Sequence, residues 1–215
     1  MISFGIYCFT GIINLASAFF FKEKARKITK CCLMPALFVF YLLGTEQMLF
    51  MVIAALFFSW LGDIFLIYKE KQIFFKLGLA AFLVSHIFYI GAFLTLAGGV
   101  HTMALIISPA VAVPIALAIL KLLSAPPPMK IPVAAYAIVI MLMSISALQL
   151  MLASLDSSRP AGILIFASSL VYLFSDTYMA YLLFHTKPKY FNFITMIPYI
   201  IAHGGIIMGL VLGFN

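Results

Sequence analysis

Four ionisable side chains stand inside long apolar stretches of this 215-residue sequence, at Asp63, His86, Asp176 and His203. A charged group within a membrane helix costs on the order of 2.5–3.5 kcal/mol, so such groups usually face a cavity and mark a functional site. Two carboxyl and two imidazole groups would supply proton donors and acceptors. The structural alternative is an aspartate paired with a lysine, or a histidine that joins two helices by a hydrogen bond. Because each group separately costs stability, we favour a shared functional site.

Helical spacing gives each of these groups a hydroxyl neighbour. Side chains three or four residues apart lie on the same face of a helix. The resulting pairs are Ser59 with Asp63, Tyr89 with His86, Tyr172 with Asp176, and Tyr199 with His203. A carboxylate flanked by hydroxyl donors is what a polar site surrounded by lipid requires.

The elements that position these residues are predicted to be membrane helices. Of the residues, 66% are hydrophobic and only 9% are charged, whereas a soluble domain carries about 25% charged residues. The long unbroken apolar runs favour helices over a barrel, whose strands would alternate in polarity. We predict an all-α polytopic membrane protein of about eight transmembrane helices, with residues 1–215 as a single transmembrane domain. The expected spans are 3–21, 31–45, 47–68, 73–97, 103–123, 131–154, 161–183 and 193–213.

The basic residues predict an orientation. Twelve of the 13 Lys and Arg residues fall in or beside the odd-numbered connections, of which Lys22–Lys30 is the richest. Lys and Arg prefer cytoplasmic loops, so both termini are expected on the opposite, non-cytoplasmic face. Because the basic residues are spread over several short loops, nucleic-acid binding is not expected, despite a net charge of +7. Both aspartates would then lie near the cytoplasmic ends of their spans and both histidines near the midplane, around one cavity open to the cytoplasmic leaflet.

The first span is expected to be a retained helix, although Ala16-Ser17-Ala18 resembles a cleavage site, because no basic residue precedes its apolar run. A weak internal similarity also relates the third and fourth spans to the seventh and eighth. It is explained either by two four-helix halves that arose by duplication or by chance similarity between apolar helices.

Several short motifs together resemble the YhhN-type lysoplasmalogenase family over nearly the whole chain. They are Leu61-Gly62-Asp63, Ser85-His86-Ile87-Phe88-Tyr89, Ser175-Asp176, Tyr199-Ile200-Ile201-Ala202-His203, and Lys30 followed by Met34-Pro35. The sequence differs from the family pattern at His203, where a glutamine is expected, and at Cys31, where a proline often follows the lysine.

The resemblance implies hydrolysis of the vinyl-ether bond of lysoplasmalogens to a fatty aldehyde and glycerophosphoethanolamine or glycerophosphocholine. Vinyl ethers hydrolyse by protonation of the β-carbon, which a protonated carboxyl group can supply while a second carboxylate stabilises the cation or activates water. A low-dielectric cavity and the repulsion of like charges would leave one proton on the pair Asp63 and Asp176. We expect His86 and Tyr89 to act with this catalytic pair. The expected substrate-binding residues are Lys30, at the head-group phosphate, with Ser59, Tyr172, Ser175, Tyr199 and His203.

Two alternatives remain open from the sequence. A metal-dependent lipid hydrolase would use the two histidines and two aspartates as zinc ligands, and a small proton-coupled transporter would use them as a proton relay. The preferred hypothesis involves no metal or cofactor, and its partners are a lysophospholipid substrate and the membrane lipids. The expected location is a bacterial-type inner membrane or an equivalent internal membrane. The oligomeric state is not indicated.

Overall fold

The computed structural model describes residues 2–99, 102–155 and 158–214, and within them the chain forms eight α-helices and no strand. The all-α prediction is therefore confirmed. The helices are α1 (Ile2–Phe19), α2 (Glu23–Gly44), α3 (Phe50–Leu66), α4 (Gln72–Leu96), α5 (Thr102–Leu123), α6 (Lys130–Ala153), α7 (Arg159–Phe184) and α8 (Phe191–Gly213), with a short 3₁₀ turn at Pro127–Met129 before α6.

Length and hydropathy identify most of these helices as membrane spans. Helices α1, α2, α4, α6, α7 and α8 are long and apolar enough to cross a bilayer, while α3 and the Val113–Leu123 part of α5 are shorter apolar helices. Large apolar side chains such as Ile2, Leu43, Phe50 and Ile131 are largely exposed on the outside of the bundle. This surface requires lipid around it, so the chain is a multi-pass integral membrane protein.

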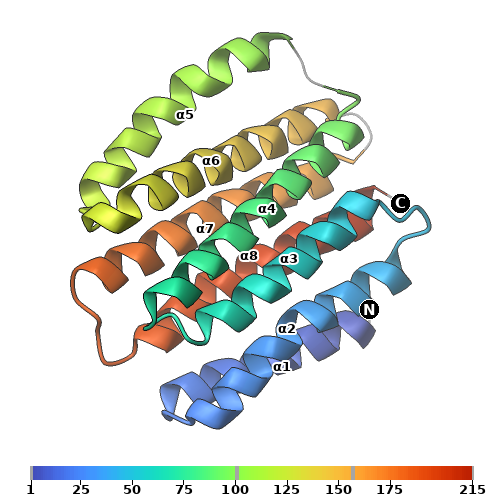
Figure 1. Cartoon of the computed structure of the whole chain (residues 1–215). Coiled ribbons are helices and arrows are strands. Elements are labelled where there is room, and N and C mark those ends of the chain that lie inside the picture. Colours follow the sequence, from blue (N-terminus) through green and yellow to red (C-terminus); the bar gives the residue numbers. More distant parts are fainter. Residues whose placement is uncertain (1, 100–101, 156–157, 215) are drawn as a thin grey trace.

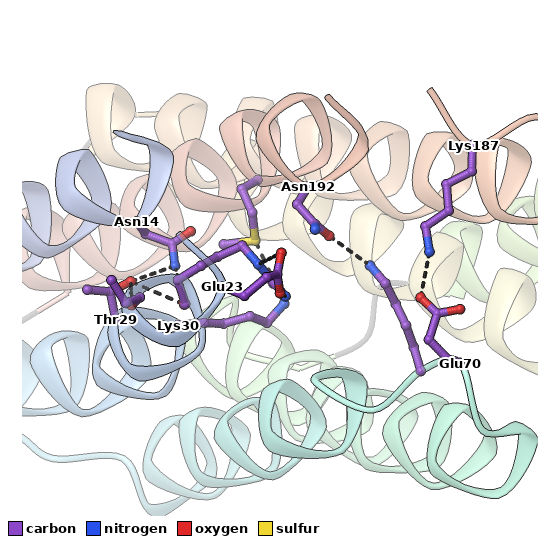
Figure 2. A network of polar contacts seen from close by, with 11 residues as sticks. Asn14, Glu23, Thr29, Lys30, Glu70, Lys187 and Asn192 are labelled. Carbon is purple, nitrogen blue, oxygen red and sulfur yellow. Dashed lines mark hydrogen bonds and ion pairs between the residues drawn. The ribbon is translucent and has the colours of Figure 1, made fainter. Parts of the chain in front are cut away.

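The second helix begins earlier than the sequence suggested. The connection expected at 22–30 consists instead of the first two turns of α2, which starts at Glu23. Lys, Glu, Ala and Arg are strong helix formers, and Arg26 donates to Glu23 at 2.6 Å within the first turn. Asn14 of α1 adds hydrogen bonds to the Arg26 carbonyl and to Thr29, each 2.8 Å long (Figure 2). As a result, Arg26 and Lys30 lie four residues apart on one helix face.

Seven helices form a closed circuit of neighbours, in the order α1, α2, α3, α4, α6, α7 and α8, with α8 returning to α1. Helix α5 packs on α6 and α7 at the outside of the bundle (Figure 1). The odd-numbered connections lie at one end of the bundle, and the even-numbered connections and both termini lie at the other (Figure 1). The two expected halves do not pack alike, because α1 contacts α8 whereas α5 has no matching contact with α4 among the described residues.

A proline in α2 creates a polar gap that Trp60 of α3 fills. Pro35 lacks the N–H that would bond to the carbonyl of Cys31, four residues earlier. Trp60 Nε1 donates to this carbonyl at 3.0 Å. The bond joins the two helices within their apolar segments, where an unsatisfied carbonyl is costly.

We expect Trp60→Phe to lower the free energy of unfolding by about 1 kcal/mol, because the Cys31 carbonyl loses its donor. In a Pro35→Ala background the helix regains its own N–H at position 35, so the same substitution should cost about half as much or less. Denaturant unfolding in detergent micelles measures both values. Equal costs in the two backgrounds would show that the bond to Cys31 does not stabilise the protein.

Candidate active site

A cavity with an empty volume of about 990 Å³, open solvent included, lies between α2, the end of α3, α4, α5, α6, α7 and α8. Its apolar wall comes mainly from α4, α5 and α6, through Phe75, Leu79, Phe82, Ile119, Leu123, Val133 and Ile140. Its polar wall holds Arg26, Lys30, Lys69, Tyr136, Ser175, Asp176, Thr177, Asn192, Thr195 and Tyr199. The two walls suit a ligand with one polar and one apolar part.

Asp176 of α7 is the carboxyl group on the cavity wall. Its side chain is half-buried, and Tyr136 of α6 donates a hydrogen bond to Oδ2. Both residues line the cavity. Because one carboxylate oxygen is engaged by Tyr136, the other is available to a ligand in the cavity.

Asp63 of α3 lies directly behind the same wall. It is fully buried, and Tyr199 of α8 donates to its Oδ2 at 2.6 Å. Lys30 of α2 forms an ion pair with its Oδ1 at 3.1 Å. Lys30 also lies 3.7 Å from Met196 Sδ and 5.1 Å from the centre of the Tyr199 ring. Since Lys30 of α2 and Tyr199 of α8 both line the cavity, Asp63 of α3 holds these two wall residues in place.

The expected site residues therefore divide into two groups. Lys30, Ser175, Asp176 and Tyr199 line the cavity, and Asp63 contacts two of them. The other five expected residues, Ser59, His86, Tyr89, Tyr172 and His203, are buried outside the lining.

His86, Tyr172 and His203 form an aromatic cluster between the two tyrosines of the cavity. Tyr172 lies between the histidines, with ring centres 4.8 Å from His86 and 4.4 Å from His203. His86 reaches Tyr136 at 5.3 Å, and His203 reaches Tyr199 at 4.3 Å. The cluster thus packs against both tyrosines that hold the carboxyl groups, and it fixes their positions.

Ser59 and Tyr89 are further from the chemistry. Ser59 shares a hydrogen bond of 2.8 Å with Ser85, which also bonds to the Ala55 carbonyl, so that it joins α3 to α4. Tyr89 stacks on Phe93 at 5.8 Å between ring centres and is fully buried. Helical spacing correctly placed His86 and Tyr89 on one buried face, but neither side chain lines the cavity.

Six polar residues of the wall were missed by the sequence reasoning: Arg26, Lys69, Tyr136, Thr177, Asn192 and Thr195. Arg26 and Lys69 were placed in loops and used only to predict the orientation of the chain in the membrane. Tyr136 stands alone among apolar residues, with no ionisable residue three or four positions away. Its depth was the available signal, because it lies six residues into α6 from the end of the bundle that Asp176 also approaches.

The end of the cavity nearest the odd-numbered connections is cationic. Lys69 follows α3, and its Nζ lies 3.4 Å from Oδ1 of Asn192 in the first turn of α8 (Figure 2). Nearby, Lys187 pairs with Glu70 at 2.5 Å and links the α7–α8 connection to the α3–α4 connection (Figure 2). The hydrogen bond from Lys187 lowers the pKa of Glu70, so this bridge is charged at neutral pH.

The donor geometry bears on the metal alternative. Structural and catalytic zinc sites use three or four protein ligands. Across the described parts of the chain, no three His, Cys, Asp or Glu side chains come together as such a group. Asp63 is instead paired with Lys30, and His86 and His203 are separated by Tyr172. These four side chains therefore do not form the ligand set that the metal alternative expects.

Fold and site together define a polytopic helical membrane protein with a cavity inside the bundle, whose wall holds one carboxyl group and several cations. The sequence profile of the YhhN family matches residues 25–210. This match covers most of the chain and all the residues of the cavity, so the protein belongs to the YhhN family. Comparison with curated proteins and with solved structures gives no match.

Proposed function

We propose that the protein hydrolyses the vinyl-ether bond of lysoplasmalogens within the membrane. The observation that carries the proposal is the position of Asp176, a half-buried carboxyl group on the wall of a cavity that is apolar on one side and cationic at one end. A single-chain phospholipid has the matching parts, with a hydrocarbon chain, a reactive bond beside the glycerol, and a charged head group. Membership in the YhhN family supports the same activity.

In the proposed reaction, the protonated carboxyl group of Asp176 gives its proton to the β-carbon of the vinyl ether, which leaves an oxocarbenium ion beside the new carboxylate. Water adds to the cationic carbon and returns a proton to Asp176. The hemiacetal then collapses to a fatty aldehyde, and its hydroxyl proton passes to the glycerol oxygen. The reaction consumes one water, and the carboxyl group ends protonated. Tyr136, which donates to Oδ2, stabilises the carboxylate formed in the first step.

Asp63 has a different role in this proposal. Its two oxygens meet Lys30 and the Tyr199 hydroxyl, and its full burial keeps it out of contact with the substrate. We assign it as a positioning residue that presents Lys30 and the Tyr199 hydroxyl to the cavity. Because the Tyr199 hydroxyl donates to Asp63, its oxygen lone pairs are free to accept a hydrogen bond from the attacking water.

The positive-inside rule assigns the orientation in the membrane. Arg26, Lys30, Lys69 and Lys187 gather at the cavity end that faces the odd-numbered connections. This end would face the cytoplasm in a bacterial-type inner membrane, with both termini on the other side. The substrate would then enter from the cytoplasmic leaflet.

The direct test is to incubate the purified protein with an alkenyl lysophospholipid and to measure free fatty aldehyde. We expect release of aldehyde and glycerophosphate ester in equal amounts, with no loss of activity after treatment with a chelator. The matched alkyl lysophospholipid, which lacks the double bond, should release nothing. Absence of aldehyde from folded protein would refute the proposed reaction, and loss of activity with chelator would favour the metal-dependent alternative.

A further inference from the structure

Three cations approach the mouth of the cavity, and they are not equally neutralised. Arg26 bonds to Glu23 at 2.6 Å, and Lys30 pairs with Asp63 at 3.1 Å. Lys69 lines the same cavity, yet among the described residues its only polar partner is the Asn192 amide oxygen, 3.4 Å away. Lys69 therefore brings a positive charge to the cavity that no carboxylate balances.

The surroundings of Lys69 make this charge costly. Burial, together with Lys30, Arg26 and Lys187, lowers the pKa of Lys69 well below that of a free lysine, and Glu70 opposes the shift only weakly. Such a cluster of cations is destabilising unless a counter-charge joins it. An anion placed between Lys69 and Arg26 would remove the repulsion and would gain two charge-assisted hydrogen bonds.

We propose that Lys69, Arg26 and Asn192 bind the phosphate diester of a single-chain lipid head group, with Lys69 as the principal ligand. The assignment rests on the proposed function and deepens it. Lys69 takes the place of Lys30, the head-group ligand expected from the sequence, because the ammonium group of Lys30 is already paired with Asp63.

The fold supports a phosphate at this position in two ways. Arg26 uses Nε and Nη2 for its bonds to Glu23, which leaves the other N–H groups of its guanidinium to donate to phosphate oxygens, and Lys69 adds a point charge. Asn192 is the second residue of the 23-residue helix α8, whose positive end faces the same place. Glu23 and Glu70, the acidic residues nearest this end, are each held by a cation of their own, so the anion meets no free carboxylate there.

The position also suits the proposed chemistry. Lys30 is one helical turn deeper than Arg26 along α2, and Asp176 lies eight residues before the end of α7, about 12 Å from that end at 1.5 Å per residue. A phosphate held at the mouth would leave the glycerol to span the distance to Asp176. The hydrocarbon chain would continue against the apolar wall of α4, α5 and α6.

The test measures binding rather than turnover, on the full-length protein in detergent. The probe is a saturated 1-O-alkyl glycerophosphoethanolamine, which has no vinyl ether to hydrolyse. The comparison ligands are the 1-O-alkylglycerol of the same chain length, glycerophosphoethanolamine without a chain, and inorganic phosphate. Titration calorimetry of native protein, Lys69→Met and the control Lys71→Met gives the dissociation constants. Lys71 is an exposed lysine in the same connection.

We expect Lys69→Met to weaken binding of the phospholipid by about 10-fold or more, as for loss of a charge-assisted hydrogen bond. Binding of the alkylglycerol should be unchanged, and Lys71→Met should behave like native protein. Equal weakening of phospholipid and alkylglycerol, or no difference between the two variants, would overturn the assignment. If inorganic phosphate binds as tightly as the lipid and with the same dependence on Lys69, the site serves free phosphate and the lipid assignment is wrong.

A second variant decides the matter if Lys69→Met fails to fold. Asn192→Asp places a carboxylate beside Lys69 and fills the anion position from within the protein, so it should also weaken phospholipid binding while leaving alkylglycerol binding intact. Unchanged phospholipid binding by this variant would contradict the proposal. Because the probe is not a substrate, Lys69-dependent binding without aldehyde release would refute the proposed reaction alone, and aldehyde release with Lys69-independent binding would refute only the phosphate site.

Discussion

Asp176→Asn should reduce the rate of aldehyde release by about 10²- to 10⁴-fold, the usual contribution of a general acid. The amide has the size of the carboxyl group and still accepts the hydrogen bond from Tyr136, but it has no proton of suitable acidity for the β-carbon of a vinyl ether. The effect should appear in kcat, because the group acts on the reacting atoms and contributes little to binding. Initial rates of aldehyde release at several substrate concentrations measure it.

Two controls accompany this substitution. Thr177→Val changes a neighbouring residue of the cavity lining that has no assigned role, and it should alter the rate only a few-fold. Binding of the non-hydrolysable alkyl lysophospholipid by Asp176→Asn should match native protein, which shows that the cavity is intact. If the folded Asp176→Asn protein keeps more than a tenth of the native rate, Asp176 is not the proton donor.

Much of the fold was predictable because lipid imposes a simple pattern on the sequence. Long apolar runs and the distribution of Lys and Arg predicted eight helices, and the structure shows eight within the described residues. The start of α2 was misplaced because basic residues were taken as a sign of a loop. In α2, however, Glu23 neutralises Arg26, and Lys30 finds Asp63, so the charged turns remain helical.

The composition of the site was only partly predictable, for a physical reason. In a soluble helix the apolar face identifies the core, but here both the lipid-facing and the core-facing sides are apolar, so the sequence does not give the rotation of each helix. Sequence reasoning therefore gave the same weight to Asp176, which faces the cavity, and to Asp63, which lies behind it. It also missed Tyr136, because α6 packs against α4 as well as α7 and this order does not follow the chain.

In the aromatic cluster, the sequence correctly predicted which side chains share a helix face, but not which of them reach the cavity. The spacing of Tyr199 and His203 placed both on one face, and their rings lie 4.3 Å apart. Tyr199 reaches the cavity and His203 does not. A residue one turn further along a helix is about 6 Å deeper, and this distance separates the wall of the cavity from the packed core behind it.

Lys30→Met and Asp63→Asn should each lower the free energy of unfolding by about 3–5 kcal/mol, the cost of leaving one member of a buried ion pair without its partner. The pair qualifies as buried, because the exposed fractions of the two side chains are 12% and 0%. The double variant should be more stable than either single variant, because it leaves no unpaired charge. In it, the amide introduced at position 63 still accepts from Tyr199, and the thioether introduced at position 30 packs against Met196. Denaturant unfolding in detergent micelles gives the three free energies.

The matched comparison is Lys187→Met, which breaks the pair with Glu70 at the edge of the bundle. These side chains are 41% and 71% exposed, so solvent screens the interaction and the loss should stay below about 1 kcal/mol. Costs of Lys30→Met and Asp63→Asn that simply add in the double variant would mean that the two charges do not stabilise each other. In that case Asp63 does not position Lys30, and only the hydrogen bond from Tyr199 connects Asp63 to the cavity wall.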